Sequence, residues 1–574
     1  MCYLKKENRN CIFLDFIYFT CPLKGISYSM KKLEVLTIPS MLQTSYRDFP
    51  QNQSLVFAGE KNRSYAQLEI EVKKAASQLK SLGVKKGDKV AILSMNMPNW
   101  GVSYFAISVL GAVVVPVLPD FHPVEIKNIL EHADVSVVYV SETLRSKLDP
   151  LNGPTIIAIE NFVVQSETQD VSYDEIDENL FEYEKVNESD LLSIIYTSGT
   201  TGKSKGVMLT HKNIVWTAQQ SWIIQNIVPS DRFLSVLPLS HTFENTLGLI
   251  LPIKYGASVS YLQKPPVASV LLAALKEVQP TIMLVVPLII EKIYKSKILP
   301  EINRKFATRV LYKIPVFRKL LHKVAGKKLY ESFGGQLKFF GIGGAKLDNN
   351  VEQFLMEGGF PLAIGYGMTE SSPLLAGAGV GKTRFLSTGT AMEGVKLRIA
   401  GADPKTGQGE IQAKGENVMI GYYKEPEISK QAFTSDGWLK TGDLGYFDAD
   451  GNLYIKGRIK NMIVGSSGEN IYPEEIETVI NRMEYVLESL VVQQKGRLVA
   501  LVHLNMEELE RKYHDLRSET VTFLNEKADE LLKEIQKKVN DELNKFSQIQ
   551  RFILQQEPFE KTPTQKIKRF LYYA

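Results

Sequence analysis

Hydrophobic positions along the chain alternate between a helical spacing and short continuous runs. Leu68, Val72, Ala75 and Leu79 recur every three or four residues, which predicts a helix that begins after Ser64. Further segments of the pattern are a strand over residues 89–94, a helix over 99–110, and strands over 112–117, 191–196, 233–237, 281–286 and 337–341. Strands that alternate with helices in this way form a sheet covered on both faces, so the pattern predicts an α/β fold.

The pattern changes near Arg458, where short strands and then a charged helical stretch over residues 506–546 replace the earlier alternation. A chain of 574 residues exceeds the size of one ordinary domain. We therefore expect a large multi-layer domain with mixed or parallel sheets over residues 30–457, followed by a small, mobile α+β domain over residues 458–574. The charged stretch is interpreted as a solvated helix face.

The first 29 residues differ from the rest of the chain. They contain all three cysteines and a basic segment followed by an apolar one, as in a signal peptide, but Asp15 interrupts the apolar run and no small-residue cleavage site follows. We predict that residues 1–29 are an extension ahead of a natural start at Met30. The remaining sequence offers no cysteine for a disulfide framework, a thiol nucleophile or a zinc cluster, which favours a cytoplasmic protein.

Charge and hydropathy narrow the class of partner. A formal net charge of +4 over this length does not indicate nucleic-acid binding, and no run of 18 uncharged apolar residues predicts a membrane span. Between residues 304 and 328, nine basic residues and no acidic one are interleaved with apolar side chains. This segment is either a peripheral contact with the anionic inner face of a membrane or a solvated basic rim over an apolar core face.

The segment Tyr196–Val207 is rich in glycine and hydroxyl side chains and lies between two apolar runs. Such a loop surrounds anionic oxygens, because glycine lets backbone N–H groups point inward while Lys203 and Lys205 add positive charge. The alternative is an ordinary hairpin turn. The phosphate-binding candidates are Thr197, Ser198, Gly199, Thr200, Thr201, Gly202 and Lys205.

Three better-known motifs do not fit the sequence. A P-loop requires glycine at the position that Thr197 occupies, and Gly341–Lys346 lacks the final glycine of the dinucleotide-binding motif. The chain also has no G-x-S-x-G segment of the kind that carries a hydrolase serine. Kinase or GTPase, dinucleotide-dependent and serine-hydrolase chemistry are therefore not indicated.

Further motifs follow the phosphate loop in a fixed order. They are Leu237–Glu244, Gly343–Ala345, Gly365–Glu370, Gly415–Tyr423, Thr441–Asp443, Gly457–Arg458 and Lys561–Lys566. Together with the loop, they make the chain similar to the adenylate-forming (AMP-binding) superfamily, with the closest likeness to long-chain fatty acid–CoA ligases. The resemblance implies an enzyme that uses ATP to adenylate a carboxylic acid and passes the acyl group to the thiol of coenzyme A.

The resemblance assigns the groups that meet the triphosphate. A carboxylate substrate is already ionised at neutral pH, so the barrier to its attack is the meeting of two anions rather than a deprotonation. Glu370 and Thr197 would hold Mg²⁺, for which a carboxylate is a suitable hard ligand, and Thr369 would touch phosphate. Lys566 would bridge the attacking carboxylate and the α-phosphate.

The same resemblance assigns the nucleoside site. Asp443 would accept hydrogen bonds from both ribose hydroxyls, with Arg458 reinforcing the sugar, and Tyr366 would stack on adenine. The remaining positions of the nucleotide site are Gly343, Gly344, Ala345 and Gly367.

Other family positions lie outside the nucleotide site. Lys460 would be the hinge about which the small domain rotates between the two half-reactions. His241 would be a gate at the acyl entrance, because neither half-reaction requires its proton. The loop expected beside the thiol contains Gly465, Gly468 and Glu469, and the departures from the family pattern are Ser204, Asn461 and Gln565.

The residues beside one motif narrow the range of acid substrates, whereas the acceptor stays open. Residues 364–366 lack the tryptophan that blocks the pocket of acetate-activating relatives, so a medium- or long-chain fatty acid is expected. An aryl acid remains an alternative substrate, and an acyl carrier protein remains an alternative acceptor. A catalytically idle nucleotide-binding partner protein is the alternative from another functional class.

Overall fold

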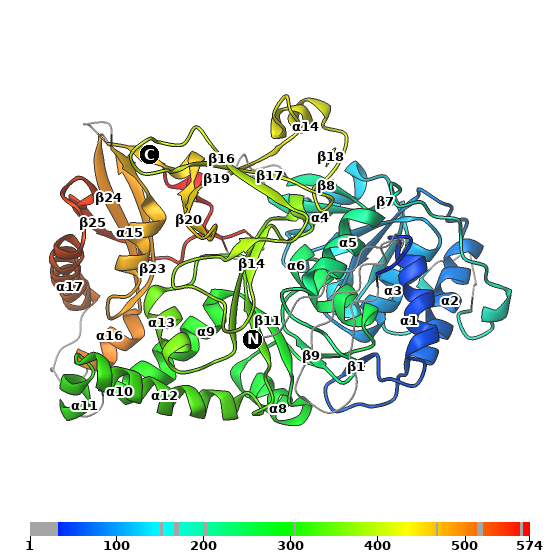
Figure 1. Ribbon diagram of the computed structural model, residues 1–574, viewed down its shortest axis with the longest axis horizontal. Helices are drawn as coiled ribbons and strands as arrows, with labels where there is room; N and C mark the ends of the chain where they lie inside the picture. Colours follow the sequence, from blue (N-terminus) through cyan, green and yellow to red (C-terminus); the bar gives the residue numbers. More distant parts are fainter. Residues whose placement is uncertain are drawn as a thin grey trace, which may run out of the picture.

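The computed structural model describes residues 32–149, 153–165, 172–198, 204–303, 306–465, 469–494, 496–513, 521–562 and 566–573. The predicted extension over residues 1–29 lies outside these ranges. The structure contains two large sheets with helices, a smaller sheet and a C-terminal group of strands and helices, which confirms the α/β fold (Figure 1).

The first sheet has eight strands in the order β18-β8-β7-β3-β2-β4-β5-β6. Its strands are β2 (Lys89–Leu93), β3 (Val113–Val117), β4 (Val135–Val140), β5 (Thr155–Ala158), β6 (Val163–Gln165), β7 (Leu191–Ser198), β8 (Ser204–Thr210) and β18 (Gly421–Tyr422). The central strands are parallel, whereas β7 and β8 form an antiparallel hairpin. Its helices are α1 (Ile38–Asp48), α2 (Tyr65–Ser81), α3 (Pro98–Val109), α4 (Pro123–His132) and α5 (His211–Ser221).

The second sheet also has eight strands, in the order β1-β10-β9-β11-β12-β13-β14-β15. They are β1 (Leu55–Phe57), β9 (Arg232–Ser235), β10 (Ser258–Tyr261), β11 (Ile282–Val285), β12 (Phe339–Ile342), β13 (Leu362–Tyr366), β14 (Ala376–Ala378) and β15 (Thr390–Ala391). The associated helices are α6 (Thr242–Glu244), the π-helix η3 (Asn245–Ile250), α7 (Leu251–Lys254), α8 (Ala268–Val278), α9 (Pro287–Ile293), α10 (Leu299–Asn303), α11 (Phe306–Leu311), α12 (Pro315–Ser332) and α13 (Asn349–Glu357).

A four-stranded antiparallel sheet follows, made of β16 (Lys396–Ala400), β17 (Gly409–Lys414), β19 (Leu439–Phe447) and β20 (Leu453–Arg458). The helix α14 (Pro426–Ala432) precedes β19. After Arg458 come the short turn η6 (Ile459–Asn461), β21 (Ile463–Val464), β22 (Asn470–Ile471), β23 (Val486–Gln494), β24 (Arg497–Leu504) and β25 (Arg551–Leu554). The C-terminal helices are α15 (Pro473–Ile480), α16 (Met506–Tyr513) and α17 (Val521–Glu542).

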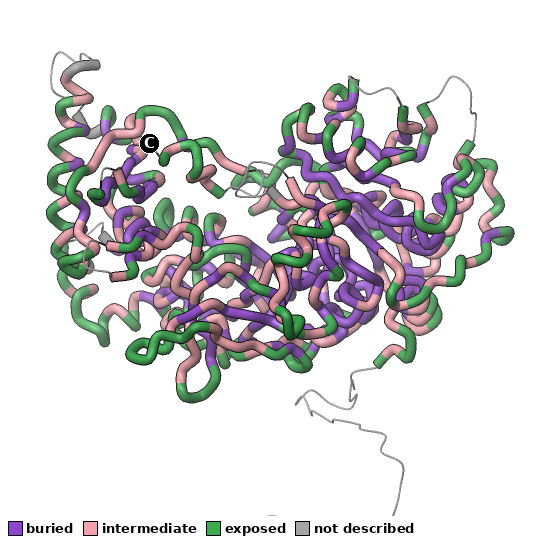
Figure 2. The backbone as a smooth tube through the Cα atoms, turned by 90° about the horizontal axis from the view of Figure 1, so that it is seen from above, coloured by how far each residue is buried: buried purple, intermediate pink, exposed green. Residues whose placement is uncertain are grey.

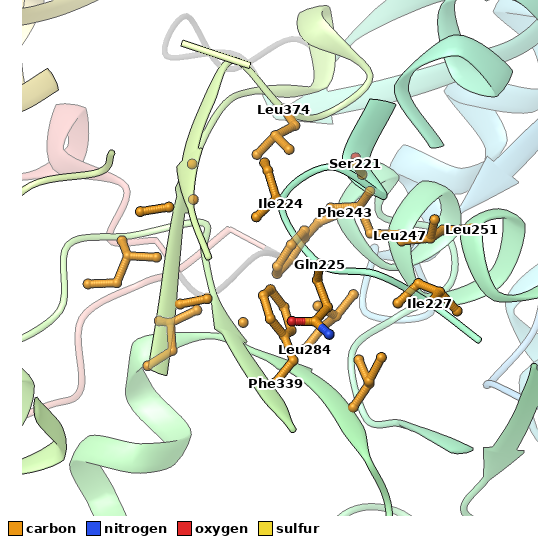
Figure 3. A pocket seen from close by; sticks show the side chains of 18 of the residues that line it. Ser221, Ile224, Gln225, Ile227, Phe243, Leu247, Leu251, Leu284, Phe339 and Leu374 are labelled. Carbon is orange, nitrogen blue, oxygen red and sulfur yellow. The ribbon is translucent and has the colours of Figure 1, made fainter. Parts of the chain in front are cut away.

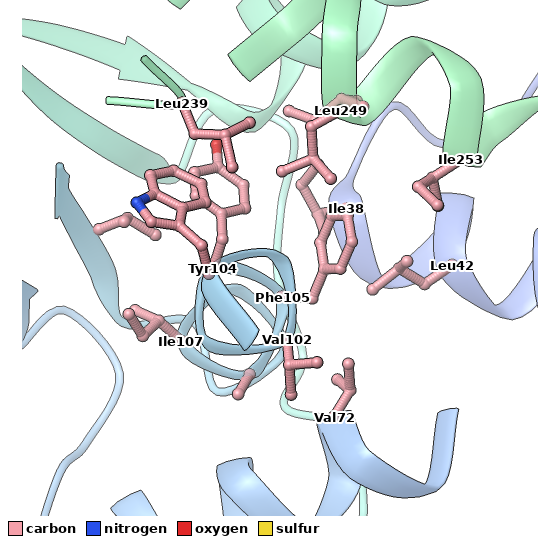
Figure 4. Close-up of a cluster of buried hydrophobic side chains, with 14 of the residues drawn as sticks. Ile38, Leu42, Val72, Val102, Tyr104, Phe105, Ile107, Leu239, Leu249 and Ile253 are labelled. Carbon is pink, nitrogen blue, oxygen red and sulfur yellow. The ribbon is translucent and has the colours of Figure 1, made fainter. Parts of the chain in front are cut away.

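Helix α3 lies at the centre of the largest core. Every residue from Trp100 to Val109 is buried. Figure 4 shows Val102, Tyr104 and Phe105 of this helix among side chains from α1, α2 and η3. The purple segments of Figure 2 are concentrated in this part of the molecule. A helix that is apolar all round fits only such an interior position.

The elements follow the sequence pattern closely, with local differences at their ends. Ser64 caps α2 by accepting a hydrogen bond from the backbone of Gln67. Pro315 separates α11 from α12 and occupies the first turn of α12. The charged stretch expected over residues 506–546 contains α16 and α17. Among the described residues, no helix is both long and apolar enough to cross a membrane.

Candidate active site

Asp443 and Arg458 are paired across the antiparallel strands β19 and β20. The Nε atom of Arg458 lies 2.8 Å from Oδ1 of Asp443, and the hydroxyl of Tyr366 donates a hydrogen bond of 2.6 Å to Oδ2. Tyr366 is the last residue of β13, so this contact joins the second large sheet to the four-stranded sheet. The three expected nucleoside residues therefore meet at one place.

Asp443 is only 5% exposed, so its charge depends on these partners. Burial raises the pKa of its carboxyl group above the ordinary value, whereas the Arg458 guanidinium and the Tyr366 hydroxyl act to lower it. Each carboxylate oxygen has two lone pairs, and one partner occupies each oxygen. Acceptor capacity for vicinal hydroxyl groups therefore remains on both oxygens.

Lys566 reaches the same site from the C-terminal end of the chain. Its pKa is lowered first by desolvation and then by the positive charge of Arg458, whereas Asp443 and Glu370 act to raise it. Arg458, Asp443 and Glu370 therefore lie near enough to Lys566 to act on its charge. Lys566 is exposed as a whole residue, whereas desolvation is the largest influence on its ammonium group.

The turn that carries Lys566 is closed by its own backbone. Thr562 N–H donates to the carbonyl of Lys566 at 2.7 Å, and Lys561 pairs with Ile567 across a short antiparallel bridge. Residues 563–565, which include Gln565, lie outside the described residues. The bridge fixes the position of Lys566 relative to the segment that precedes it.

Glu370 has a partner that the sequence motifs did not identify. The hydroxyl of Tyr422 donates a hydrogen bond of 2.9 Å to Oε1 of Glu370, and the Lys205 ammonium lies 5.4 Å from the centre of the Tyr422 ring. Tyr422 is in β18, which pairs with β8 beside the phosphate loop. Its place in the Gly415–Tyr423 motif was the available signal, although nothing in the spacing pointed to Glu370.

The phosphate loop is described only at its two ends. Thr197 is paired with Lys205 in the β7–β8 hairpin, and the backbone of Ser198 is paired with that of Ser204. The candidates Gly199, Thr200, Thr201 and Gly202 lie outside the described residues. The hairpin brings Lys205 toward Glu370 through Tyr422, so the loop and the expected metal ligand belong to one region.

The donor set near the loop suits a magnesium ion bound together with phosphate. Among the described residues, no group of three or more His, Cys, Asp or Glu side chains could hold a metal ion by itself. Glu370 and Thr197 would supply one carboxylate and one hydroxyl. Mg²⁺ is commonly held by one or two carboxylates while water and phosphate oxygens complete its octahedron, so the residues present fit this ion.

Gly343, Gly344 and Ala345 form a strip of small residues at the expected nucleotide site, and Gly367 belongs to the same site. Two of these positions require glycine. Gly344 has a φ of +84°, and a Cβ atom on Gly367 would lie 1.7 Å from the carbonyl oxygen of Pro373. Gly343 is buried against the ring of Phe243, whereas Ala345 is exposed and Thr369 is buried. The strip is therefore shaped by backbone rather than by side chains.

An apolar cavity of about 60 Å³ adjoins this strip. It is lined mainly by Ile224, Phe233, Phe243, Leu284, Phe339 and Gly365, and Figure 3 shows Phe243 and Phe339 facing one another across it. Phe243 contacts Gly343 and also lines the cavity, so it separates the nucleotide strip from the apolar space. An apolar part of a substrate would fit this cavity, beside the expected nucleotide site.

His241 caps the helix that carries Phe243. Its Nδ1 atom accepts a hydrogen bond of 3.2 Å from the backbone of Phe243. Burial, followed by the charge of Lys566, lowers the pKa of His241 to about 4, so the imidazole is neutral at physiological pH. Since Nδ1 is an acceptor, the proton of the neutral ring is on Nε2.

The expected hinge and thiol loop belong to the C-terminal part of the chain. Lys460 is in the turn η6 directly after β20, and the neighbouring Asn461 donates a hydrogen bond of 2.6 Å to Glu474. The N–H of Gly465 donates to the carbonyl of Glu469 at 2.8 Å, while Gly468 lies outside the described residues. Within the described ranges, no hydrogen bond or ion pair joins this loop to the nucleotide site.

Among the described residues, the C-terminal part makes a small number of polar contacts with the four-stranded sheet and with the second large sheet and its helices. The Tyr472 hydroxyl donates a hydrogen bond of 2.9 Å to Gln408, which precedes β17. Arg482 lies 3.0 Å from Asp348, and Lys456 lies 3.0 Å from Glu475. Lys295 also donates to the carbonyl of residue 481 at 2.7 Å. Such a limited set of contacts between two parts of a chain is compatible with their relative motion.

The family model for AMP-binding enzymes matches residues 42–423. The chain belongs to this family. Long-chain-fatty-acid–CoA ligase heimdall of Drosophila melanogaster is 29% identical over 500 residues, which are 78% of this chain and 72% of the relative. Long-chain-fatty-acid–[acyl-carrier-protein] ligase AEE15 of Arabidopsis thaliana is also 29% identical, over 89% of this chain and 81% of its own.

Solved structures of AMP-binding enzymes share the fold. The o-succinylbenzoate CoA synthetase of Bacillus subtilis, bound to its acyl-adenylate intermediate, superposes with a TM-score of 0.73 at 24% identity and covers 93% of this chain and 98% of its own. ATP-bound MatB of Rhodopseudomonas palustris gives a TM-score of 0.73 at 22% identity, with 93% and 97% covered. The likeness extends through the C-terminal part of the chain.

Proposed function

We propose that the protein is an AMP-forming fatty acid–CoA ligase, an acid–thiol ligase that adenylates a medium- or long-chain fatty acid and transfers the acyl group to coenzyme A. The observation that supports the proposal is the contact of Tyr366 and Arg458 with Asp443 close to an apolar cavity, together with the influence of Asp443, Arg458 and Glu370 on the charge of Lys566. An idle nucleotide-binding protein has no need for a lysine placed there by a separate part of the chain.

In the first half-reaction, a fatty acid carboxylate attacks the α-phosphate of ATP and pyrophosphate leaves. Asp443 would accept hydrogen bonds from the ribose hydroxyls, with Tyr366 beside the base. Lys566 would bridge the carboxylate and the α-phosphate, since a fixed cation lowers the cost of bringing two anions together. Mg²⁺, when bound, would neutralise charge on the leaving pyrophosphate. Glu370 and Thr197 are the residues proposed to hold it, and Thr369 would touch phosphate.

In the second half-reaction, a thiol must replace AMP on the same acyl carbon. We propose that residues 458–574 move as a unit about Lys460, which withdraws Lys566 and brings the Gly465–Glu469 loop to the site. A thiol with a reference pKa of about 8.5 supplies enough thiolate for the attack without a dedicated base. The exposed position of Lys460 directly after β20 supports a hinge there.

The acyl group would enter the cavity beside Phe243. Typical small-molecule sites measure about 300–1,000 Å³, so a long chain would require Phe243, Phe339 or their neighbours to move. We propose that His241 and Phe243 form the gate between the nucleotide strip and this cavity. The almost entirely apolar lining supports an alkyl chain over a polar acid.

Coenzyme A is the acceptor we propose, and the phosphopantetheine of an acyl carrier protein is the second candidate. The relative named for an acyl-carrier-protein ligase, at the same identity as the CoA ligase relative, favours keeping this candidate. We also propose a cytoplasmic location. A peripheral contact with a membrane belongs to the same proposal, because a long-chain acid partitions into bilayers.

The deciding experiment is fatty-acid-dependent exchange between ATP and labelled pyrophosphate, measured with palmitate, decanoate, benzoate and acetate. Exchange with palmitate or decanoate is the expected result, followed by thioester formation on adding coenzyme A. Exchange with benzoate alone would replace the fatty acid by an aryl acid. No exchange with any acid would overturn the proposal, and thioester formation only with a carrier protein would change the acceptor.

A further inference from the structure

Helices α11 and α12 expose a row of apolar side chains. Val316, Leu320 and Val324 follow one another at helical spacing on α12 and are 75%, 58% and 53% exposed, and Phe306 on α11 is 74% exposed. Soluble surfaces rarely leave such side chains together, and contiguous exposed apolar groups mark an interaction site. We refer to Phe306, Val310, Val316, Phe317, Leu320 and Val324 as the outer row.

Lysines flank the outer row. Lys313, Lys319, Lys323 and Lys328 are exposed, and within the described residues none of them makes an ion pair. The guanidinium of Arg309 lies over the ring of Phe306 at 5.5 Å. Residues 306–330 contain no acidic side chain. The surface therefore combines apolar groups with unneutralised positive charge.

The opposite face of α12 is firmly packed, so the outer row is not a core face left open by a misplaced helix. Arg318 and His322 each lie 2.8 Å from Glu357 on α13. A Cβ atom on Gly326 would lie 2.6 Å from the carbonyl oxygen of residue 358, which shows how closely α12 approaches that backbone. Leu329 is buried in the same core. The rotation of α12 is fixed by these contacts.

The sequence left two interpretations of this segment, and the exposures favour one of them. A solvated basic rim requires the apolar side chains to be buried, whereas Val316 and Leu320 point outward together with Lys319 and Lys323. In Figure 1, α10, α11, α12 and α8 extend along the lower edge of the molecule, away from the labelled strands of the four-stranded sheet. This edge offers an elongated surface to a large partner.

We propose that α11 and α12 bind the surface of an anionic lipid bilayer. The outer row would enter the boundary between headgroups and acyl chains, while Lys319 and Lys323 extend to the lipid phosphates. Each lysine near an anionic leaflet strengthens binding about fivefold, so a small set with apolar support is sufficient for reversible binding. An acidic carrier protein would satisfy the lysines but leave Val316, Leu320 and Phe306 without a comparable apolar partner.

The place of α11 and α12 in the fold indicates how contact with a bilayer would serve the enzyme, and this step rests on the proposed function. The chain passes from α12 through Phe333 and Leu337 into β12, whose first residue, Phe339, lines the apolar cavity. A fatty acid dissolved in a bilayer would then be collected at the same side of the second sheet that holds the cavity. The bilayer contact itself does not depend on which acid is activated.

The test is co-sedimentation of the full chain with vesicles of phosphatidylcholine alone and of phosphatidylcholine with phosphatidylglycerol. Binding to the anionic vesicles at low salt, and weaker binding at about 0.15 M salt, is expected. Lys319→Glu with Lys323→Glu reverses two charges and should weaken binding at least about tenfold. Val316→Ser with Leu320→Ser keeps every charge and should weaken it as well.

A matched control is provided by the exposed face of α17, where Lys537→Glu with Lys538→Glu makes the same charge change and should leave vesicle binding unaltered. Failure of the wild-type chain to bind anionic vesicles at low salt would overturn the proposal. Equal weakening by the α17 control would do so too, since the effect would then be one of net charge. Loss of carrier-protein use in the α12 charge variant, without an effect on vesicles, would assign the surface to a carrier.

Pyrophosphate exchange with detergent-dispersed decanoate, measured on the same preparations, separates this proposal from the proposed function. Exchange should be retained in every α12 variant, because none of the substituted residues is in the nucleotide site. Vesicle binding without exchange would remove the ligase assignment and leave the bilayer surface standing. Exchange without vesicle binding would remove the bilayer surface and leave the ligase standing.

Discussion

The hydroxyl of Tyr366 donates a hydrogen bond of 2.6 Å to the buried carboxylate of Asp443, at the junction of two sheets. Hydrogen bonds to charged groups contribute about 1.5–3 kcal/mol, so this contact helps to keep Asp443 ionised despite its burial. The tyrosine expected to stack on adenine therefore also sets the protonation of the proposed ribose ligand. A substitution at Tyr366 can therefore separate stacking on adenine from control of the Asp443 charge.

Tyr366→Phe keeps the ring and removes the hydrogen bond. Because that hydrogen bond lowers the pKa of Asp443, its loss raises the pKa further and leaves less ionised carboxylate in acid. We expect a higher KM for ATP, with the difference from the wild type growing as pH falls from 8 to about 5.5. Tyr446→Phe, on the same strand as Asp443 but stacked on Tyr454, is the control. A pH-independent difference in KM would contradict this explanation.

Lys566→Ala should affect only one half-reaction. Removing a preorganised cation from a developing charge typically costs about 100- to 1,000-fold in rate, so fatty-acid-dependent pyrophosphate exchange should fall by roughly that factor. Thioester formation from supplied acyl-adenylate and coenzyme A should stay within a few-fold of the wild type. Lys568→Ala, which removes a lysine 3.7 Å from Glu560, is the control. Equal loss of both half-reactions would argue against the proposed role of Lys566.

Tyr422→Phe should change the magnesium dependence of the reaction. The Tyr422 hydroxyl orients the Glu370 carboxylate, and the loss of a residue that orients a metal ligand typically weakens metal binding by about 10- to 100-fold. We expect the Mg²⁺ concentration for half-maximal pyrophosphate exchange to rise at least roughly tenfold. Tyr423→Phe alters the next residue, whose ring packs on His132 instead, and should leave this concentration unchanged. An unaltered Mg²⁺ dependence in Tyr422→Phe would refute the role of Tyr422.

Glu244 provides a test of pH-dependent stability. Burial raises the pKa of its carboxyl group to about 8, from an ordinary value of about 4.5. The folded state therefore holds the proton more tightly than the unfolded state does. The resulting stability is fully present below pH 4.5 and is lost as pH rises through about 8, at about 1.4 kcal/mol per unit of pKa shift.

Glu244→Gln carries no charge at any pH and should lack this loss. We expect its melting temperature to exceed that of the wild type by an amount that increases between pH 6 and pH 9, as measured by calorimetry. Glu331→Gln, at an exposed position on α12, is the control and should follow the wild type. A constant difference between Glu244→Gln and the wild type over this range would show that the carboxyl group does not titrate as proposed.

Much of the fold follows from local patterns that the sequence displays. The helix after Ser64 and the strand–helix–strand series from residue 89 to residue 117 are correct within a residue or two, since their apolar periodicities are long and clear. The break between α11 and α12 also follows from the sequence, because the fixed φ of Pro315 interrupts a helix and suits the first turn of the next one. Periodicity alone does not state which side of a proline the helix occupies.

The sequence by itself determined the family. The glycines and charged residues that this family's nucleotide site requires lie in several motifs, and these motifs occur along the chain in the family's order. Only the tertiary structure decided which of those residues meet. The Tyr422–Glu370 contact joins positions 52 residues apart, and Tyr366 and Asp443 are 77 apart, so no local spacing encodes either pair. The outward direction of Val316 and Leu320 was likewise open until α13 fixed the rotation of α12, since an apolar stripe specifies a buried face only when another element covers it.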